Sequence, residues 1–479
     1  MKRSKSIYYV IIVASVFFLS LITDWYDVLI FLLSGTVLIF VLDKLGKGIV
    51  LRELIAFHSC FVCLVMPWVG FQWYTIENPL ARLWVRYMPV SESTYFNFAL
   101  PAVSAFVTTL IWPIKKDDID DEGEYMFKYI LRLKVVLQRR PFTGIQILTV
   151  GFLASLITPF LPTGLEFVGN LMSWTAFAGI LYVYFTPKLK YRTLILILFA
   201  IMILEQSLQQ AMFTIVAYMG ITIFSFLFLQ RSSPMWKKIS MFLVAAFLLL
   251  IIQNVKTTFR RQVWFKGYAG DKTELFTDLL SQRIDAGVFT LLTPDALFPV
   301  YYRTNQGFNI GLVMRRFPAI KEFDYGSKLA IDVASSFVPR FLWPDKPKAG
   351  GQYNMKYYTG LVIEGWSTNV GPVGEAYGSF GVNGGIFYMF CLGLFVRWAY
   401  ILLFKASRKI PLLILWMPVL FYQVTYSAEN DTLQLLNSLL KSAFLVWVLY
   451  KALPTLFGIG RHLDKAKQSL PSGLPNPTN

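Results

Sequence analysis

The sequence is poor in charged residues, histidines and cysteines, and each shortage excludes a class of protein. Only 15% of its 479 residues are charged, whereas about 25% is usual in a soluble domain. Two histidines are too few for a histidine metal cluster, and three cysteines cannot build a disulfide framework. Cys60 and Cys63 lie inside the apolar run HSCFVCLVMPWV, where a redox or zinc site lacks a second ligand pair. We therefore expect no metal and no cofactor.

What the sequence has instead is apolar and basic residues. Hydrophobic residues make up 56% and aromatic residues 17% of the chain, and the mean hydropathy is +0.53. The net charge of +17 suggests nucleic acid in a soluble protein, but no basic arm stands apart from the apolar runs. We therefore expect a membrane protein that does not bind nucleic acid.

The apolar runs predict an all-α polytopic membrane protein with about 12 transmembrane helices. The expected spans are 7–22, 27–42, 54–73, 97–114, 143–161, 166–186, 193–205, 211–229, 239–254, 379–404, 410–427 and 433–450. They divide the chain into helices one to nine (1–254, with a linker at 115–142), one large extracytoplasmic loop (255–378), helices ten to twelve (379–450) and a tail (451–479).

Lysine and arginine predict the orientation. They gather in alternate short connections, whereas TDWYD (23–27), EQSLQQ (205–210) and SAEND (427–431) have none. The rule that positive loops stay inside then places both termini in the cytoplasm. The linker 115–142 joins an acidic run to a basic amphipathic helix, and we expect it either to lie on the anionic inner leaflet or to be solvated.

The loop 255–378 is too long for a plain connection. Helical periodicity over 273–292 and 327–343 predicts helices that lie along the outer surface or form a small packed lid. The loop is also basic, which indicates either an anionic substrate or ordinary surface charge. Its cations include Lys256, Arg260, Arg261, Arg283, Arg303, Arg315, Arg316, Lys321, Arg340, Lys346 and Lys348.

Two stretches of the loop are the most informative. In VPRFLWPDKP (338–347), three prolines hold Arg340, Asp345 and Lys346 on a stiff turn, which suits either a diphosphate site or a structural turn. In VGPVGEAYGSFGVNGG (370–385), Glu375 lies among glycines at the edge of a span. A carboxylate there is costly unless it is paired, for example with a loop arginine, or catalytic as a general base.

These residues resemble a known family. PRFLWPDKP after a basic amphipathic segment, followed by GEAYGSFGVNGG opening a helix, is similar to the Wzy-type polymerases of O-antigen and exopolysaccharide repeat units. The resemblance implies a metal-independent, inverting glycosyltransferase in the bacterial cytoplasmic (inner) membrane. Its substrates would be polyprenyl-diphosphate-linked oligosaccharides, as donor and acceptor, and a chain-length regulator or a flippase would be a possible partner.

The resemblance also implies roles for particular residues. Arg340 and Glu375 are the expected catalytic pair, with Glu375 as the base ahead of Glu364 and Asp345. Glu205 is a further polar candidate near the outer leaflet. The expected diphosphate-binding residues are Arg340, Lys346, Arg303, Arg315, Arg316, Arg260 and Arg261.

Three other readings stay open. A flippase for the same lipid-linked sugars would share the basic residues, but it usually shows two similar halves, and we find no internal repeat. A ligase-type or lipid-phosphate-sugar-dependent glycosyltransferase is the second rival, although neither His58 nor His462 is expected outside the membrane. A structural or signalling membrane protein is the third.

Overall fold

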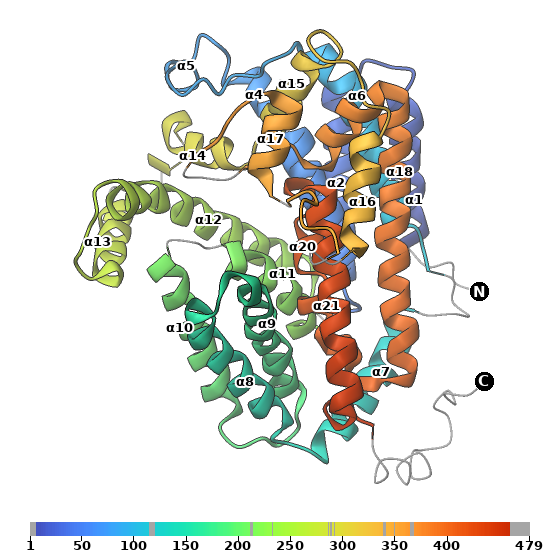
Figure 1. The fold of residues 1–479 in the computed structure, drawn as a ribbon, viewed down its shortest axis with the longest axis vertical. Helices are drawn as coiled ribbons and strands as arrows, with labels where there is room; N and C mark the ends of the chain where they lie inside the picture. Colours follow the sequence, from blue (N-terminus) through green and yellow to red (C-terminus); the bar gives the residue numbers. More distant parts are fainter. Residues whose placement is uncertain are drawn as a thin grey trace.

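The computed structural model describes residues 6–114, 120–210, 214–231, 233–285, 287, 290–291, 293–338, 342–348, 350–364 and 368–459. These residues form helices joined by short turns (Figure 1), and within them no strand occurs beyond two isolated bridges. The predicted all-α fold class is therefore confirmed.

Eight helical segments are long and apolar enough to cross a membrane, which supports a membrane protein. They are Tyr26–Lys44, Leu51–Gln72, Glu92–Ile111, Thr143–Phe160, Leu165–Phe185, Met235–Val263, Gly371–Lys409 and Thr432–Ala452. Helices α1 (Ser6–Ser20), α10 (Arg192–Gln210) and α11 (Thr214–Leu227) also lie where spans were expected. The count of about 12 spans and the orientation of the chain stay predictions.

The main core is built around α6 (Glu92–Ile111), which packs against the long helix α18 (Gly371–Lys409), α1 and α3 (Leu51–Cys60). Small residues allow this close approach, because a Cβ at Gly393 would lie 2.6 Å from the Phe106 carbonyl oxygen. Helices α8 (Thr143–Ile157) and α9 (Thr163–Phe185) pair in the same way, with Gly151 against the backbone of Ala176.

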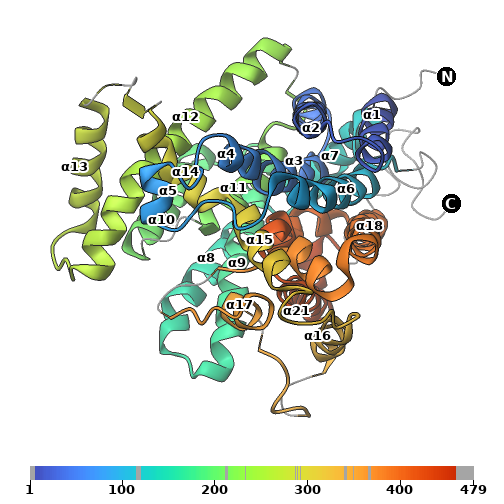
Figure 2. The same cartoon turned by 90° about the horizontal axis from the view of Figure 1, so that it is seen from above.

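A second, smaller core lies apart from the first. It joins α10 to α12 (Met235–Arg260) and α13 (Lys272–Asp285), through side chains that include Leu208, Val255, Phe259 and Phe276. Both views place α13 at the edge of the molecule farthest from α1 (Figures 1 and 2). The sequence predicted a span ending at 254, whereas α12 continues to Arg260 and then into a π-helical turn, Arg261–Phe265.

The large loop contains its own helices. They are α13, α14 (Pro294–Thr304), α15 (Gln306–Arg316), α16 (Ser327–Phe337) and α17 (Gly351–Thr359). The two expected loop helices, 273–292 and 327–343, begin with α13 and α16, but α13 ends at Asp285 and α16 at Phe337. They pack on α12 and on α21 (Thr432–Ala452) respectively. Whether they also touch lipid stays a prediction.

Helix α18 reverses direction at Gly381, whose φ of 66° and ψ of −157° break the helix. A Cβ at Gly385 would lie 3.0 Å from the Ala376 carbonyl oxygen, so residues 371–380 fold back along residues 382–409. Only glycine adopts this backbone conformation at low cost. The predicted boundary at residue 378 therefore falls inside a re-entrant helix, which we define as residues 371–380.

The expected span 410–427 is not a continuous helix. It consists of short pieces, Pro411–Trp416, Met417–Leu420, Tyr422–Thr425 and Ser427–Glu429. Pro411 and Pro418 lack the N–H groups that a helix needs. Because this broken segment is almost wholly buried in protein, its irregular backbone is sheltered from lipid.

Candidate functional site

The broken segment ends in a carboxylate that is held from two other elements. Glu429 Oε2 lies 2.7 Å from Arg303 Nη1 of α14. Its Oε1 lies 3.2 Å from His58 Nε2 of α3. Glu429 thus bridges a loop helix and a core helix.

Helix α12 brings two more cations to the same place. Lys256, with 6% of its surface exposed, interacts electrostatically with Arg260, Arg303 and Glu429. Arg260 also interacts with Arg303. We call His58, Lys256, Arg260, Arg303 and Glu429 the Glu429 cluster. Whatever the charge on buried Lys256, Arg260 and Arg303 outnumber the one carboxylate, so the cluster has a surplus of positive charge.

The cluster is held together by charge. Arg303 lies 2.7 Å from one oxygen of Glu429 and His58 lies 3.2 Å from the other, and a neighbouring cation favours the carboxylate form of an acid. Arg303 keeps 38% of its side chain exposed, so the cluster is open to a ligand at that side chain.

The cluster lies within the depth of the spans. His58 is six residues beyond Arg52 along α3, which is about 9 Å at the usual helical rise. It is 14 residues before Gln72, where the segment Leu51–Gln72 ends, or about 21 Å along that segment. Ionisable side chains inside a span are costly, which makes them candidates for function.

Glu375, the expected base, lies in a different set of contacts. It is fully buried in the re-entrant helix and accepts hydrogen bonds from Asn354 Nδ2 (2.6 Å) and from the Thr432 amide (2.9 Å) and hydroxyl (2.6 Å). None of these donors is the loop arginine that we considered as its partner. Three donors therefore already occupy its two oxygens.

Amide side chains extend this network toward the Glu429 cluster. Asn369 donates to Asp431 (2.8 Å), and its own carbonyl oxygen accepts from Gln306 (2.7 Å) and Asn309 (2.9 Å). Asp431 caps α21 through the Gln434 amide. Residues 427–431 therefore connect the cationic cluster to the contacts that hold Glu375.

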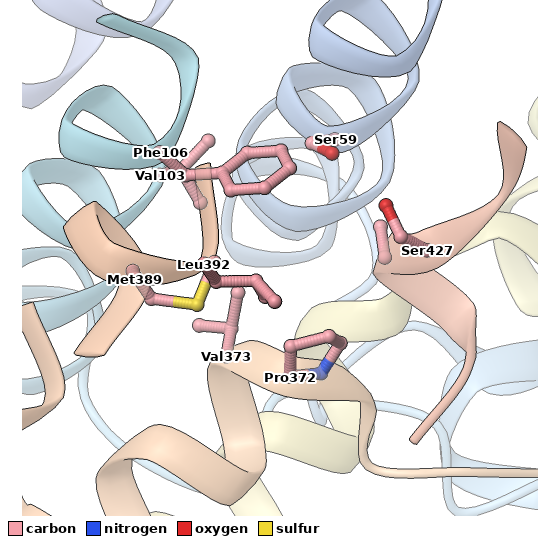
Figure 3. Close-up of a pocket in the computed structure, with 9 residues that line it drawn as sticks. Ser59, Val103, Phe106, Pro372, Val373, Met389, Leu392 and Ser427 are labelled. Atoms are coloured by element: carbon pink, nitrogen blue, oxygen red, sulfur yellow. The ribbon is translucent and has the colours of Figure 1, made fainter. Parts of the chain in front are cut away.

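A small cavity lies beside the start of the re-entrant helix (Figure 3). Its lining is mostly apolar and includes Val103, Val373 and Met389, while the hydroxyls of Ser59 and Ser427 face each other across it. The free volume of the cavity is about 10 Å³, and a single water needs about 10–15 Å³. The cavity is therefore too small for a substrate. The Glu429 cluster, not this cavity, is the candidate site.

The structure separates the other expected diphosphate ligands from the cluster. Lys346 donates to the carbonyl oxygens of Ser335 (2.8 Å) and Val338 (2.7 Å), at the end of α16. Arg316 points to the end of α17, where its Nη1 lies 3.5 Å from the Thr359 carbonyl oxygen, and Arg315 is exposed. Arg340, the leading candidate, lies outside the described residues.

The remaining candidates are on the surface. Asp345, Glu364, Glu205 and Arg261 are all exposed. Of the described residues that were expected to bind diphosphate, Arg260 and Arg303 are the two that the structure brings together.

Sequence reasoning missed His58 and Glu429 and gave Lys256 no role. His58 was read as part of an apolar span and Glu429 as part of a short outer connection. The available signal was the run of three polar residues, Glu429–Asp431, between two apolar runs, because acids so close to lipid need partners.

Within the described residues, no group of three or more histidine, cysteine, aspartate or glutamate side chains suits a metal ion.

Comparisons place the chain in a family without giving it an activity. No curated protein and no solved structure matches the chain. A family model, "Domain of unknown function (DUF8712)", matches residues 105–408, from within α6 to the end of α18. Because this match covers more than half of its length, the chain belongs to the DUF8712 family.

Proposed function

We propose that the protein is a membrane glycosyltransferase that polymerises polyprenyl-diphosphate-linked oligosaccharide repeat units at the outer face of the cytoplasmic membrane. The observation that carries the proposal is the Glu429 cluster, in which Arg303 contacts the one carboxylate and Lys256 and Arg260 lie near Arg303. The unbalanced charge suits an anion, and arginine grips phosphate oxygens with parallel hydrogen bonds.

The surroundings of the cluster suit a lipid substrate. Helix α12, which carries Lys256 and Arg260, exposes more than half of each of Leu243, Val244 and Leu248. A polyprenyl chain lying along this apolar face would bring its diphosphate to the cations at the end of the helix. Both substrates would then meet within the plane of the membrane, which gives the reaction the advantage of proximity.

The chemistry follows from the charges. The acceptor hydroxyl oxygen attacks the anomeric carbon of the donor, the bond from that carbon to the diphosphate breaks, and the diphosphate leaves with the electron pair. The cations stabilise the charge that develops on it. Direct displacement inverts the anomeric carbon.

The hydroxyl proton needs an acceptor, and His58 is better suited to this role than Glu375. Glu375 already accepts three hydrogen bonds. In the tautomer of His58 that donates Nε2–H to Glu429, Nδ1 has the lone pair that takes a proton. Glu429 would then position both His58 and Arg303, as a carboxylate orients a catalytic histidine.

The test is chain extension by purified protein given lipid-linked repeat units, read as a glycan ladder on a gel. We expect Arg303→Ala to reduce extension at least about 100-fold, the usual cost of removing a stabilising group. Arg315→Ala, which removes an exposed arginine of the same loop, is the matched control and should extend normally. Equal activity of the two variants would refute the assignment of the cluster.

A flippase for the same lipids is the second candidate, and one observation favours it. The re-entrant helix and the broken segment resemble the discontinuous helices that bind substrates inside transporters. Cells without the protein distinguish the two functions. A polymerase defect leaves single repeat units on surface glycan, whereas a flippase defect removes even these.

A further inference from the structure

Helix α7 (Gly123–Gln138) presents two apolar stripes, and only one of them packs on the protein. Met126, Ile130, Leu133 and Leu137 are buried against the bundle. Phe127, Leu131 and Val135 recur at intervals of four residues on another side of the helix and are 50%, 45% and 40% exposed. The first stripe explains why α7 docks, and the second is left without a protein partner within the described residues.

The ends of the connection place α7 at a membrane boundary. The helix joins two candidate spans, Glu92–Ile111 and Thr143–Phe160. Just beyond the first span Trp112 is 52% exposed, and just before the second Phe142 is 65% exposed. Exposed aromatic side chains at the ends of spans mark the level of the lipid headgroups. Figure 1 shows α7 at one end of the molecule, opposite α5 (Pro79–Leu83).

The charge around the exposed stripe is positive. Between residues 123 and 142 there are five basic side chains, Lys128, Arg132, Lys134, Arg139 and Arg140, and one acid, Glu124. Lys128 pairs with Glu124 at the exposed surface, and Lys134 lies 3.1 Å from Gln230. An exposed apolar stripe with basic neighbours at a membrane boundary fits anionic lipid.

We infer that α7 is a binding surface for anionic phospholipid headgroups, with Phe127, Leu131 and Val135 inserted between the lipids and the basic side chains at the phosphates. Under the predicted orientation this is the cytoplasmic leaflet. Tyr129 connects the surface to the core, because its hydroxyl donates to the Pro411 carbonyl oxygen at the start of the broken segment. The inference does not depend on the proposed glycosyl transfer.

The test places a probe on the exposed stripe. In a Cys391→Ser background, where Cys60 and Cys63 are buried, Leu131→Cys is labelled with an environment-sensitive fluorophore. The protein is reconstituted in vesicles of phosphatidylcholine or of an equimolar mixture with phosphatidylglycerol. We expect quenching by spin-labelled lipid to be stronger in the anionic vesicles.

Charge variants make the test specific. Lys128→Gln with Arg132→Gln should weaken the preference for anionic vesicles about fivefold for each charge removed. Lys188→Gln with Lys190→Gln removes two exposed charges from another connection and should leave the preference unchanged. Equal quenching in both vesicle types would overturn anionic recognition, and no quenching in either would overturn lipid contact.

A measurement on the unlabelled chain guards against damage by the label. Wild-type protein in mixed micelles should retain phosphatidylglycerol over phosphatidylcholine in native mass spectrometry, and the Lys128→Gln, Arg132→Gln variant should lose that preference. Equal retention of both lipids by wild type would also refute the inference.

Discussion

The molecule contains two buried charge clusters that differ in balance. In the first, which we call the Asp121 network, Lys44 lies 2.9 Å from Glu53 and 2.7 Å from Asp121, while Arg52 lies 3.0 Å from Asp121. Two cations therefore meet two anions. In the Glu429 cluster, the basic side chains outnumber the one anion. Both occupy regions where an uncompensated charge is costly.

The comparison distinguishes a cluster that stabilises the fold from a cluster that can bind a ligand. The Asp121 network balances its own charges, although Arg52 Nε and Glu53 Oε2 have no hydrogen-bond partner among the described residues. It ties the end of α2 (Tyr26–Lys44) and the start of α3 to the connection before α7, and Asp121 accepts a hydrogen bond from Tyr400 of α18 (3.0 Å). The Glu429 cluster has a surplus of positive charge that an anion would complete. A balanced network indicates a fold contact, and an unbalanced one indicates a ligand site.

The largest expected effect concerns the Asp121 network. Asp121→Ala leaves Lys44 and Arg52 facing Glu53 alone, so we expect the free energy of unfolding to fall by about 3–5 kcal/mol. Thermal unfolding of purified protein would measure the loss. A variant as stable as wild type would show that water reaches the network and that its balance does not matter.

The second largest effect concerns anion binding at the Glu429 cluster. Inorganic pyrophosphate should stabilise the wild type, by about 2.7 kcal/mol at 100 times its dissociation constant, and raise its unfolding temperature. Arg303→Ala should abolish this shift, whereas Arg315→Ala should retain it. A shift that survives Arg303→Ala would place the anion elsewhere.

A third prediction uses a carboxylate that belongs to neither cluster. Asp332 of α16 is buried, with Oδ2 on Lys328 and with Oδ1 lacking a partner among the described residues. Burial is the main cause that raises the pKa of Asp332, and Lys328 opposes it.

The native state therefore holds this proton more tightly than the unfolded state, and stability should fall as pH rises through the raised pKa. One proton limits the slope to about 1.4 kcal/mol per pH unit. Asp332→Asn should flatten the profile above pH 4 (roughly the unperturbed aspartate pKa). Asp121 has the opposite sign: burial would raise its pKa, but Lys44 and Arg52 hold it well below the usual range, so its contribution is lost as pH falls.

The smallest effect concerns Lys346. Its two hydrogen bonds to the end of α16 suggest a loss of about 1 kcal/mol in Lys346→Ala, with chain extension unchanged. Loss of extension comparable to that of Arg303→Ala would restore Lys346 to the diphosphate site.

Much of the helical framework was predictable from the sequence, because apolar runs as long as 27–42 and 239–254 form helices in the structure. The run 410–427 was misleading, since hydropathy cannot distinguish a helix facing lipid from a broken chain buried in protein. Its two prolines were the physical signal. The re-entrant helix was not predicted, because Glu375 and several glycines in residues 371–378 are typical of a loop rather than of a membrane span.

The candidate site was only partly predictable. The composition of the loop correctly indicated that cations matter, but it could not say which of them converge. Lys346 and Arg316 turn toward helix ends, whereas Arg303 of α14 contacts Glu429 and Arg260 of α12 lies near Arg303. His58 joined them from a segment more than 200 residues away along the chain, a contact that only the fold creates.

The reversal at Gly381 bears on how the chain is mapped during biogenesis. An insertion machinery that reads hydropathy meets residues 371–409 as one stretch, yet the first ten residues fold back on the rest of the helix. Reporter tags placed before Gly371 and beside Gly381 should thus give the same result, either both glycosylated or both shielded. A tag placed after Lys409 should give the opposite result.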